Sequence, residues 1–186
     1  MRRPVGEAMQ PITTFAGTDN HVGDPISLGI VTVSDRASQG EYTDEGGPAI
    51  LGFFEEAINS PWTALYRCVP DEREAVEAAL IQLADKEGCH VVVTTGGTGP
   101  APRDITPEAT EAVCDRMMPG FGEQMRSISL AFVPTAILSR QVGGLRNSNP
   151  HLQSPRPTEG HQGKPSTKYG RRCRIALTYS AAPTWT

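Results

Sequence analysis

The stretch VVVTTGGTGPAPRDITPEAT, residues 91–110, decides the fold of this chain. It begins with β-branched residues only, which predict a buried strand. Three glycines within residues 96–99 then predict a tight turn, because glycine adopts backbone conformations that other residues avoid. Thr106 fits the cap of a helix and Pro107 fits its first position. A strand that turns directly into a helix is the repeating unit of α/β proteins.

The same alternation continues on both sides of this stretch. Hydrophobic periodicity and turn residues predict strands over residues 26–35, 63–70 and 89–97, and helices over 48–59, 71–88 and 106–117, with one or two further helices over 120–140. Such an order is typical of a parallel sheet covered by helices on both faces. We therefore expect an α/β fold with a mostly parallel sheet.

The two ends of the chain differ from this middle part. Residues 1–25 are rich in Gly, Pro, Thr and Asp without a period, which predicts a flexible tail. Residues 145–186 are rich in Ser, Pro, Gly, Arg and Lys, which predicts a disordered or aberrant tail. The expected domain therefore covers residues 26–144, and its C-terminal part is expected to be incomplete.

Composition narrows the class of protein. The chain has 186 residues, which fits one domain, and a net charge of −4, which argues against a nucleic-acid partner. No apolar run approaches the roughly 20 residues needed to span a membrane, so a membrane role is not expected. Its four cysteines form no Cys-x-x-Cys pair. We interpret them as reduced thiols, which indicates a cytoplasmic protein.

Three predicted loops follow strands and share one edge of the expected sheet: Ser34 to Arg36, Pro70-Asp71, and Gly96 to Asp104. Ligands of such sheets bind beyond the carboxyl ends of the strands. Glycine N–H groups next to a helix N-terminus suit a phosphate or carboxylate. The spacing matches neither the dinucleotide fingerprint nor the P-loop, and a plain turn is an equal alternative.

The same loops also contain acidic residues, whose role beside an anion-binding turn needs a separate explanation. Taken alone, Asp71 fits a helix cap and Asp104 fits a solvated acid near a helix N-terminus. Two carboxylates beside an anion-binding loop would repel a phosphate unless a divalent cation lay between them, which indicates Mg²⁺. Asp35 and Asp44 flank an exposed loop and could be plain turn residues.

Five segments together resemble the molybdopterin adenylyltransferase family of molybdenum-cofactor synthesis. They are VTVSDRASQGEYTDEGGPAI, VPDE, VVVTTGGTGPAPRDITPEAT, MPGFGEQMRSISL and PTAILSRQVGG, in order from about residue 26 to residue 144. The resemblance implies a three-layer α/β/α fold with a mostly parallel sheet. It also implies a homotrimer that transfers AMP from MgATP to the phosphate of molybdopterin and releases pyrophosphate. It also implies molybdopterin and ATP as ligands and a molybdate-insertion protein as a possible partner.

The resemblance also implies roles for particular residues. Asp71 and Asp104 fall on the two acids that the family requires, and would be catalytic and hold Mg²⁺. Substrate-binding residues implied in the same way are Ser34, Asp35, Gly96, Gly97, Thr98, Gly99, Ser139 and Arg140. Because the acceptor phosphate is itself the nucleophile, catalysis would consist of alignment and charge neutralisation.

After SRQVGG the family continues with an apolar strand and a Leu-Pro-Gly-x-Pro-Lys-Ala-Ile motif, which this sequence lacks. Codons can be chosen for Pro150 to Gly163 that, read one base later, spell Leu-Ile-Phe-Asn-Leu-Pro-Gly-Arg-Pro-Lys-Ala-Ile-Arg. Our hypothesis is that the sequence from about residue 147 is out of frame, which sequencing the gene across codons 140 to 165 decides. Two alternatives follow: a molybdopterin-binding or scaffold protein with impaired catalysis, and a related domain acting elsewhere.

Overall fold

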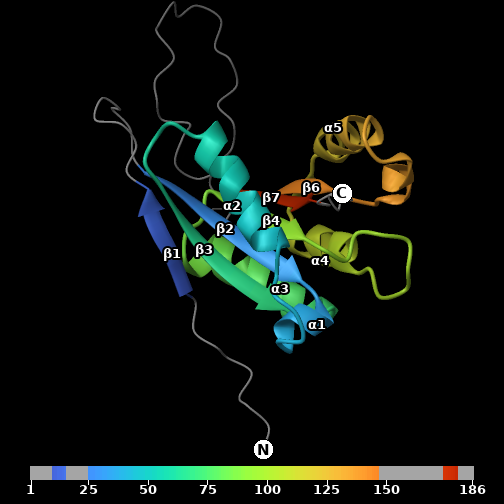
Figure 1. Cartoon of the computed structure of the whole chain (residues 1–186), viewed down its shortest axis with the longest axis horizontal. Helices are drawn as coiled ribbons and strands as arrows, with labels where there is room; N and C mark the ends of the chain where they lie inside the picture. The colour runs from blue at the N-terminus through green and yellow to red at the C-terminus, as the bar shows by residue number, and fades with distance from the viewer. Residues whose placement is uncertain (1–9, 16–24, 147–173, 180–186) are drawn as a thin grey trace, which may run out of the picture.

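A seven-stranded sheet forms the centre of the computed structural model, which describes residues 10–15, 25–146 and 174–179 (Figure 1). Its strand order is β1-β3-β2-β4-β7-β6-β5. The four inner strands are parallel: β3 (Trp62–Val69), β2 (Ile26–Val33), β4 (Val91–Thr95) and β7 (Arg174–Tyr179). The outer strands are antiparallel: β1 (Gln10–Phe15), β6 (Gly143–Arg146) and β5 (Arg116–Met117).

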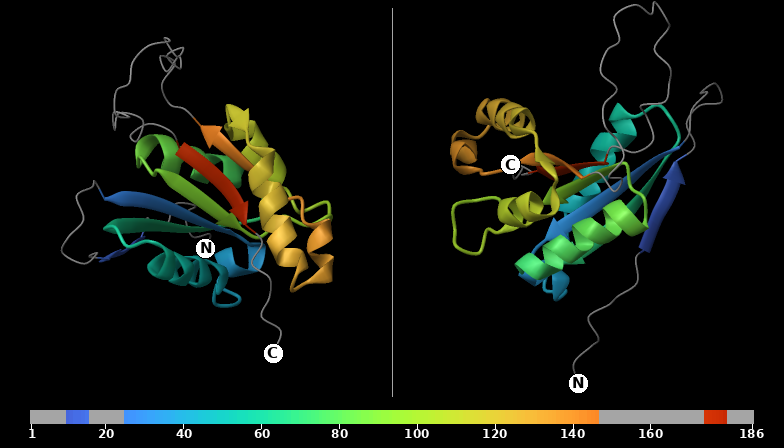
Figure 2. Two further views of the ribbon diagram at one scale, coloured as in Figure 1. Left: turned by 90° about the horizontal axis from the view of Figure 1, so that it is seen from above. Right: turned by 180° about the vertical axis from the view of Figure 1, so that it is seen from behind.

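Helices cover both faces of this sheet, so the expected three-layer α/β/α fold is confirmed (Figure 2). On one face lies α2 (Gly46–Ala57), and on the other lie α3 (Arg73–Ile81), the π-helical turn η1 (Gln82–Lys86) and α4 (Thr106–Val113). The remaining elements are the short α1 (Asp35–Ser38), α5 (Pro119–Leu130) and the 3₁₀ helix η2 (Pro134–Leu138).

Strand β2 supplies the core on both faces, since its successive side chains point to opposite sides. Leu28 and Ile30 belong to the cluster under α2, together with Ile50. Val31 and Val33 belong to the cluster under α3 and α4. Burial of each such side chain stabilises the fold by roughly 1.5–3 kcal/mol. A strand buried on both faces is what a parallel sheet requires, and it holds the loop after Val33 in a fixed position.

The prediction of a flexible tail over residues 1–25 is wrong for residues 10–15. They form β1, which pairs antiparallel with β3 and starts from Gln10 opposite Tyr66. The segment QPITTF contains two threonines, an isoleucine and a phenylalanine, which favour strands, and its proline is tolerated on an edge strand. Pairing with the open edge of β3 outweighs the loop-like composition around it. Residues 1–9 and 16–24 lie outside the described part.

The prediction of a disordered or aberrant tail over residues 145–186 is also wrong in two places. Residues 145–146 complete β6, and residues 174–179 form β7 between β4 and β6. Its segment RIALTY is rich in strand-forming residues, and both neighbours offer unpaired backbone groups to it. The sheet is therefore continuous from β4 to β6, where an incomplete fold was expected. The out-of-frame hypothesis concerns mostly residues outside the described ranges and stays a hypothesis.

Candidate functional site

The loops after β2 and β3 are joined by a reciprocal pair of hydrogen bonds. The amide of Asp35 donates to Asp71 Oδ2 over 2.8 Å, and the amide of Asp71 donates to Asp35 Oδ1 over 3.0 Å. The amide of Ser34 also donates to the carbonyl of Val69 over 2.9 Å. Asp71 therefore ties two strand ends together and does not cap the following helix, whose cap residue is Glu72.

The glycine loop after β4 packs directly on the end of β2. Gly96 has φ +96°, and a Cβ added there would lie 2.2 Å from the carbonyl oxygen of Val33. Gly97 has φ +61°, and its added Cβ would lie 2.4 Å from Thr106 Oγ1. Only glycine fits both requirements at these two positions. The predicted convergence of three loops on one edge of the sheet is thus confirmed.

Thr106 has a role other than the predicted cap. Helix α4 begins at Thr106 with Ile105 in the cap position and no capping side chain. The Thr106 hydroxyl instead donates to the carbonyl of Gly96 over 2.9 Å, and its amide donates to the carbonyl of Gly97 over 3.1 Å. The buried threonine therefore fixes the glycine loop against the start of α4.

Asp71 and Asp104 lie against this same loop. A Cβ on Gly97 would lie 3.5 Å from Asp71 Oδ1, and a Cβ on Gly99 would lie 2.7 Å from Asp104 Oδ2. Asp104 Oδ2 accepts the amide of Ala101 over 2.9 Å, and Asp71 Oδ2 is held by the loop after β2. Both acids that the sequence singled out therefore lie against the glycine loop.

Each of these acids fits a Mg²⁺ ligand, because no donor among the described residues reaches Asp71 Oδ1 or Asp104 Oδ1. Within the described ranges, no three Asp, Glu, His or Cys side chains gather closely enough to form a metal cage. Mg²⁺ usually takes one or two carboxylates and completes its octahedron with water and substrate phosphates. Asp71 and Asp104 lie beside the glycine loop, and each has one carboxylate oxygen that no described donor reaches, so they match that requirement.

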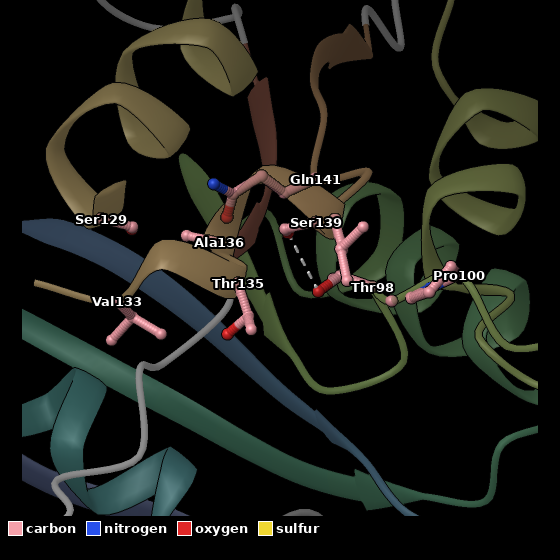
Figure 3. A pocket seen from close by; sticks show the side chains of 10 residues that line it. Thr98, Pro100, Ser129, Val133, Thr135, Ala136, Ser139 and Gln141 are labelled. Atoms are coloured by element: carbon pink, nitrogen blue, oxygen red, sulfur yellow. Dashed lines mark hydrogen bonds between the residues drawn. The ribbon is translucent and has the colours of Figure 1, made fainter. Parts of the chain in front are cut away.

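Residues far along the chain complete the edge of the loop. The amide of Arg140 donates to the carbonyl of Thr98 over 2.8 Å, and the hydroxyl of Ser139 lies 3.4 Å from Thr98 Oγ1 (Figure 3). A hollow of about 260 Å³ opens here between the loop and the α5–η2 segment. Its lining residues are Thr98, Gly99, Pro100, Ser129, Val133, Thr135, Ala136, Leu138, Ser139 and Gln141.

Ser34 and Asp35 follow β2 directly and lie beside the glycine loop. Ser34 caps α1 by accepting the amide of Ala37 over 3.3 Å, and its hydroxyl lies 3.1 Å from that of Tyr42. Asp35 forms an ion pair with Arg103 of the glycine loop. Asp35 is therefore a structural link among three loops and not the plain turn residue that the sequence allowed.

Sequence reasoning missed the part that Asp44 plays. Its carboxylate accepts hydrogen bonds from the hydroxyls of Thr32 and Tyr66, both over 2.8 Å, and from the amides of Gly46 and Gly47 over 3.0 and 2.9 Å. Burial, and then the hydrogen bond to Asp44, raise the pKa of Tyr66 above its ordinary value. Asp44 thus anchors the start of α2 to β2 and β3, and only the glycine pair that follows it hinted at this.

The fold and the site together define an α/β protein that presents a glycine loop and two acids at the carboxyl edge of a parallel sheet. A family model described as "Probable molybdopterin binding domain" matches residues 29–151. The chain belongs to this molybdopterin-binding domain family.

Relatives support the same assignment. The molybdopterin adenylyltransferases of Haemophilus influenzae and Escherichia coli K12 are each 55% identical over 130 residues, which make up 70% of this chain. The chain spans about two thirds of their length, 66% and 67%. Among solved structures, the molybdopterin biosynthesis enzyme MoaB from Thermus thermophilus matches with a TM-score of 0.64 and 34% identity, over 85% of this chain and 82% of that one.

Proposed function

We propose that this protein is a molybdopterin adenylyltransferase that transfers AMP from ATP to the terminal phosphate of molybdopterin. The observation that carries the proposal is the placement of Asp71 and Asp104 against one glycine loop, each with one carboxylate oxygen that no donor among the described residues reaches. The names of the 55% identical relatives point to the same reaction. Adenylyl transfer needs phosphate binding and charge neutralisation at one place, and we propose that the glycine loop supplies the first and the two acids the second.

The glycine loop would bind substrate phosphate through its amide groups, because Gly96 and Gly97 turn the backbone without side chains in the way. Asp71 and Asp104 would hold Mg²⁺, which neutralises charge on the phosphates of ATP. The phosphate oxygen of molybdopterin attacks the α-phosphorus of ATP, and the bond to pyrophosphate breaks. No enzyme-bound intermediate is required, so the residues of the chain act by alignment.

The hollow beside the loop is the proposed place for the pterin. It adjoins Thr98, Gly99 and Ser139, and its walls combine hydroxyl groups with apolar side chains such as Val133 and Leu138. A flat, polar-edged ring system suits a pocket of mixed character. Ser34 and Asp35, which do not line this hollow, would then face the nucleotide and its phosphates.

The assembly and surroundings are proposals too. Exposed apolar side chains gather on α5, on η2 and in the turn between them, where Phe132 of the turn is 80% exposed and Ile137 of η2 is 69% exposed. Such patches usually mark contact surfaces. The family resemblance implies a homotrimer and a molybdate-insertion protein as partner, and we propose that the trimer forms through this segment. In the described residues no helix is long and apolar enough to cross a membrane. Among the described residues, Cys68, Cys89 and Cys114 are not in disulfides, which favours a cytoplasmic location.

The test is an adenylyl-transfer assay with purified chain, molybdopterin and ATP labelled on the α-phosphate. Asp71→Asn and Asp104→Ala are each expected to slow transfer at least about a hundredfold, because each removes charge stabilisation from the reacting phosphates. Glu56→Ala, an exposed acid on α2, is the matched control and should leave the rate unchanged. Molybdopterin binding without ATP-dependent transfer by the wild type would favour the alternative, a binding or scaffold protein.

A further inference from the structure

All three guanidinium nitrogens of Arg140 donate hydrogen bonds to other residues of the protein. Nε donates to the carbonyl of Gly99 over 2.9 Å, and Nη2 donates to the carbonyl of Asp104. Nη1 and Nη2 form a forked ion pair with the carboxylate of Glu108, whose Oε2 lies 3.3 Å from Nη2. With all three nitrogens engaged, the side chain is already oriented before any ligand arrives.

The two carbonyls that Arg140 holds mark the ends of one short turn. Between Gly99 and Asp104 the chain folds back on itself, since the amide of Asp104 donates to the carbonyl of Ala101 and the amide of Ala101 donates to Asp104 Oδ2, both over 2.9 Å. The direction of the Asp104 carboxylate therefore depends on the shape of this turn. Arg140 clamps both of its ends and thereby limits how far that carboxylate can move.

Glu108 fixes the clamp in turn. It lies in the first turn of α4, a helix whose start is tied to the glycine loop through Thr106. The hydrogen bond with Arg140 lowers the pKa of Glu108, so it is ionised at neutral pH, and the same bond raises the pKa of Arg140. Without Glu108 the guanidinium would keep a free positive charge beside Asp104, where it could compete with a metal ion for the carboxylate.

We propose that Glu108 and Arg140 form a brace that positions Asp104, and that Arg140 acts on the reaction through Asp104 and not by binding substrate. The consequence for catalysis rests on the proposed function, because it takes Asp104 as a group that touches the reacting phosphates. The brace itself rests only on the contacts above. Glu108 is then a positioning residue, although the sequence motif that contains it gave no sign of this role.

Arg140→Lys is the decisive substitution. Lysine keeps the positive charge but presents it at one point, so it cannot reach Gly99, Asp104 and Glu108 together. If Arg140 positions Asp104, lysine at this position cannot replace arginine, and Arg140→Lys loses the fixed turn and the transfer rate that depends on it. If Arg140 served only as a charge for a substrate phosphate, lysine would restore much of the function.

Two measurements on the full chain test the brace. The first is amide hydrogen exchange over residues 99–104 without ligand. We expect exchange to quicken about tenfold in Arg140→Lys, which loses charged hydrogen bonds, and about two- to fivefold in Glu108→Ala, which loses an exposed ion pair. Glu108→Gln, which keeps an acceptor oxygen, should lie between Glu108→Ala and wild type. Glu111→Ala, an exposed acid on the same helix, is the control.

The second measurement is steady-state adenylyl transfer. We expect kcat to fall in Arg140→Lys and Glu108→Ala by factors like those seen in exchange, while KM for molybdopterin stays within about twofold. Unchanged exchange in Glu108→Ala, or a raised KM with normal kcat in Arg140→Lys, would overturn the proposal. If the wild type transfers no AMP, the proposed function fails, and the exchange measurement still decides whether the brace exists. Glu108→Gln serves in place of any variant that does not fold.

Discussion

Replacing Gly96 with alanine gives the most direct test of how the glycine loop is built. Gly96 has φ +96°, and the new Cβ would lie 2.2 Å from the carbonyl oxygen of Val33, which is backbone and cannot rotate away. A positive φ costs a residue with a Cβ about 1–2 kcal/mol, and overpacking adds about 1–3 kcal/mol. We therefore expect Gly96→Ala to lower the free energy of unfolding by about 2–5 kcal/mol.

Gly88→Ala separates the two causes, because Gly88 also has a positive φ of +73° but no atom lies within 4 Å of its added Cβ. This control should lose only the conformational part, about 1–2 kcal/mol. Urea unfolding followed by circular dichroism measures both variants against wild type. If Gly96→Ala costs no more than Gly88→Ala, the loop does not pack on Val33 as described, and the argument from close approach is refuted.

Three further predictions concern other parts of the molecule. Asp44→Ala removes an acceptor of four hydrogen bonds and should lower the free energy of unfolding by about 2–4 kcal/mol in urea, whereas Tyr66→Phe, which removes one of them, should cost about 1 kcal/mol. Folding raises the pKa of Tyr66, so the protonated phenol stabilises the folded state. This contribution of Tyr66 is fully present below about pH 10 and is lost as the pH rises through the folded pKa. Tyr66→Phe should therefore lack this loss of stability in alkaline thermal melts. Phe132→Asp should lower the trimer mass seen by light scattering, while Phe53→Asp, also exposed but on α2, should leave it unchanged; equal effects would argue against α5–η2 as the contact surface.

Most of the inner strands and the helices that cover them were predictable from the sequence, because each is indicated by a pattern of neighbouring residues. The β-branched runs that became β2 and β4, and the apolar spacing that became α2 and α3, report burial directly. Strand β1 and strand β7 were not predictable in this way. Each is a short run of strand-forming residues inside a segment of loop-like composition, and its sequence does not show which open edge it will pair with.

The same division holds for the site. Asp71 and Asp104 could be selected from the sequence, since both follow strand or turn signals and both belong to motifs of the resembled family. The brace of Glu108 and Arg140 could not, because its partners are 32 residues apart and meet only when η2 returns to the glycine loop. The anchoring role of Asp44 was likewise not predictable, since an aspartate shortly before two glycines is typical of an ordinary turn.

By itself, the sequence determined the strand-turn-helix units, the glycine loop and the acids that follow each strand, because these depend on the conformational preferences of neighbouring residues. Only the tertiary structure decided which backbone edges would pair, which carboxylate would accept which amide, and that Arg140 would reach Glu108 across the loop. Those choices depend on distances between residues far apart in the chain, and no local preference encodes a distance of that kind.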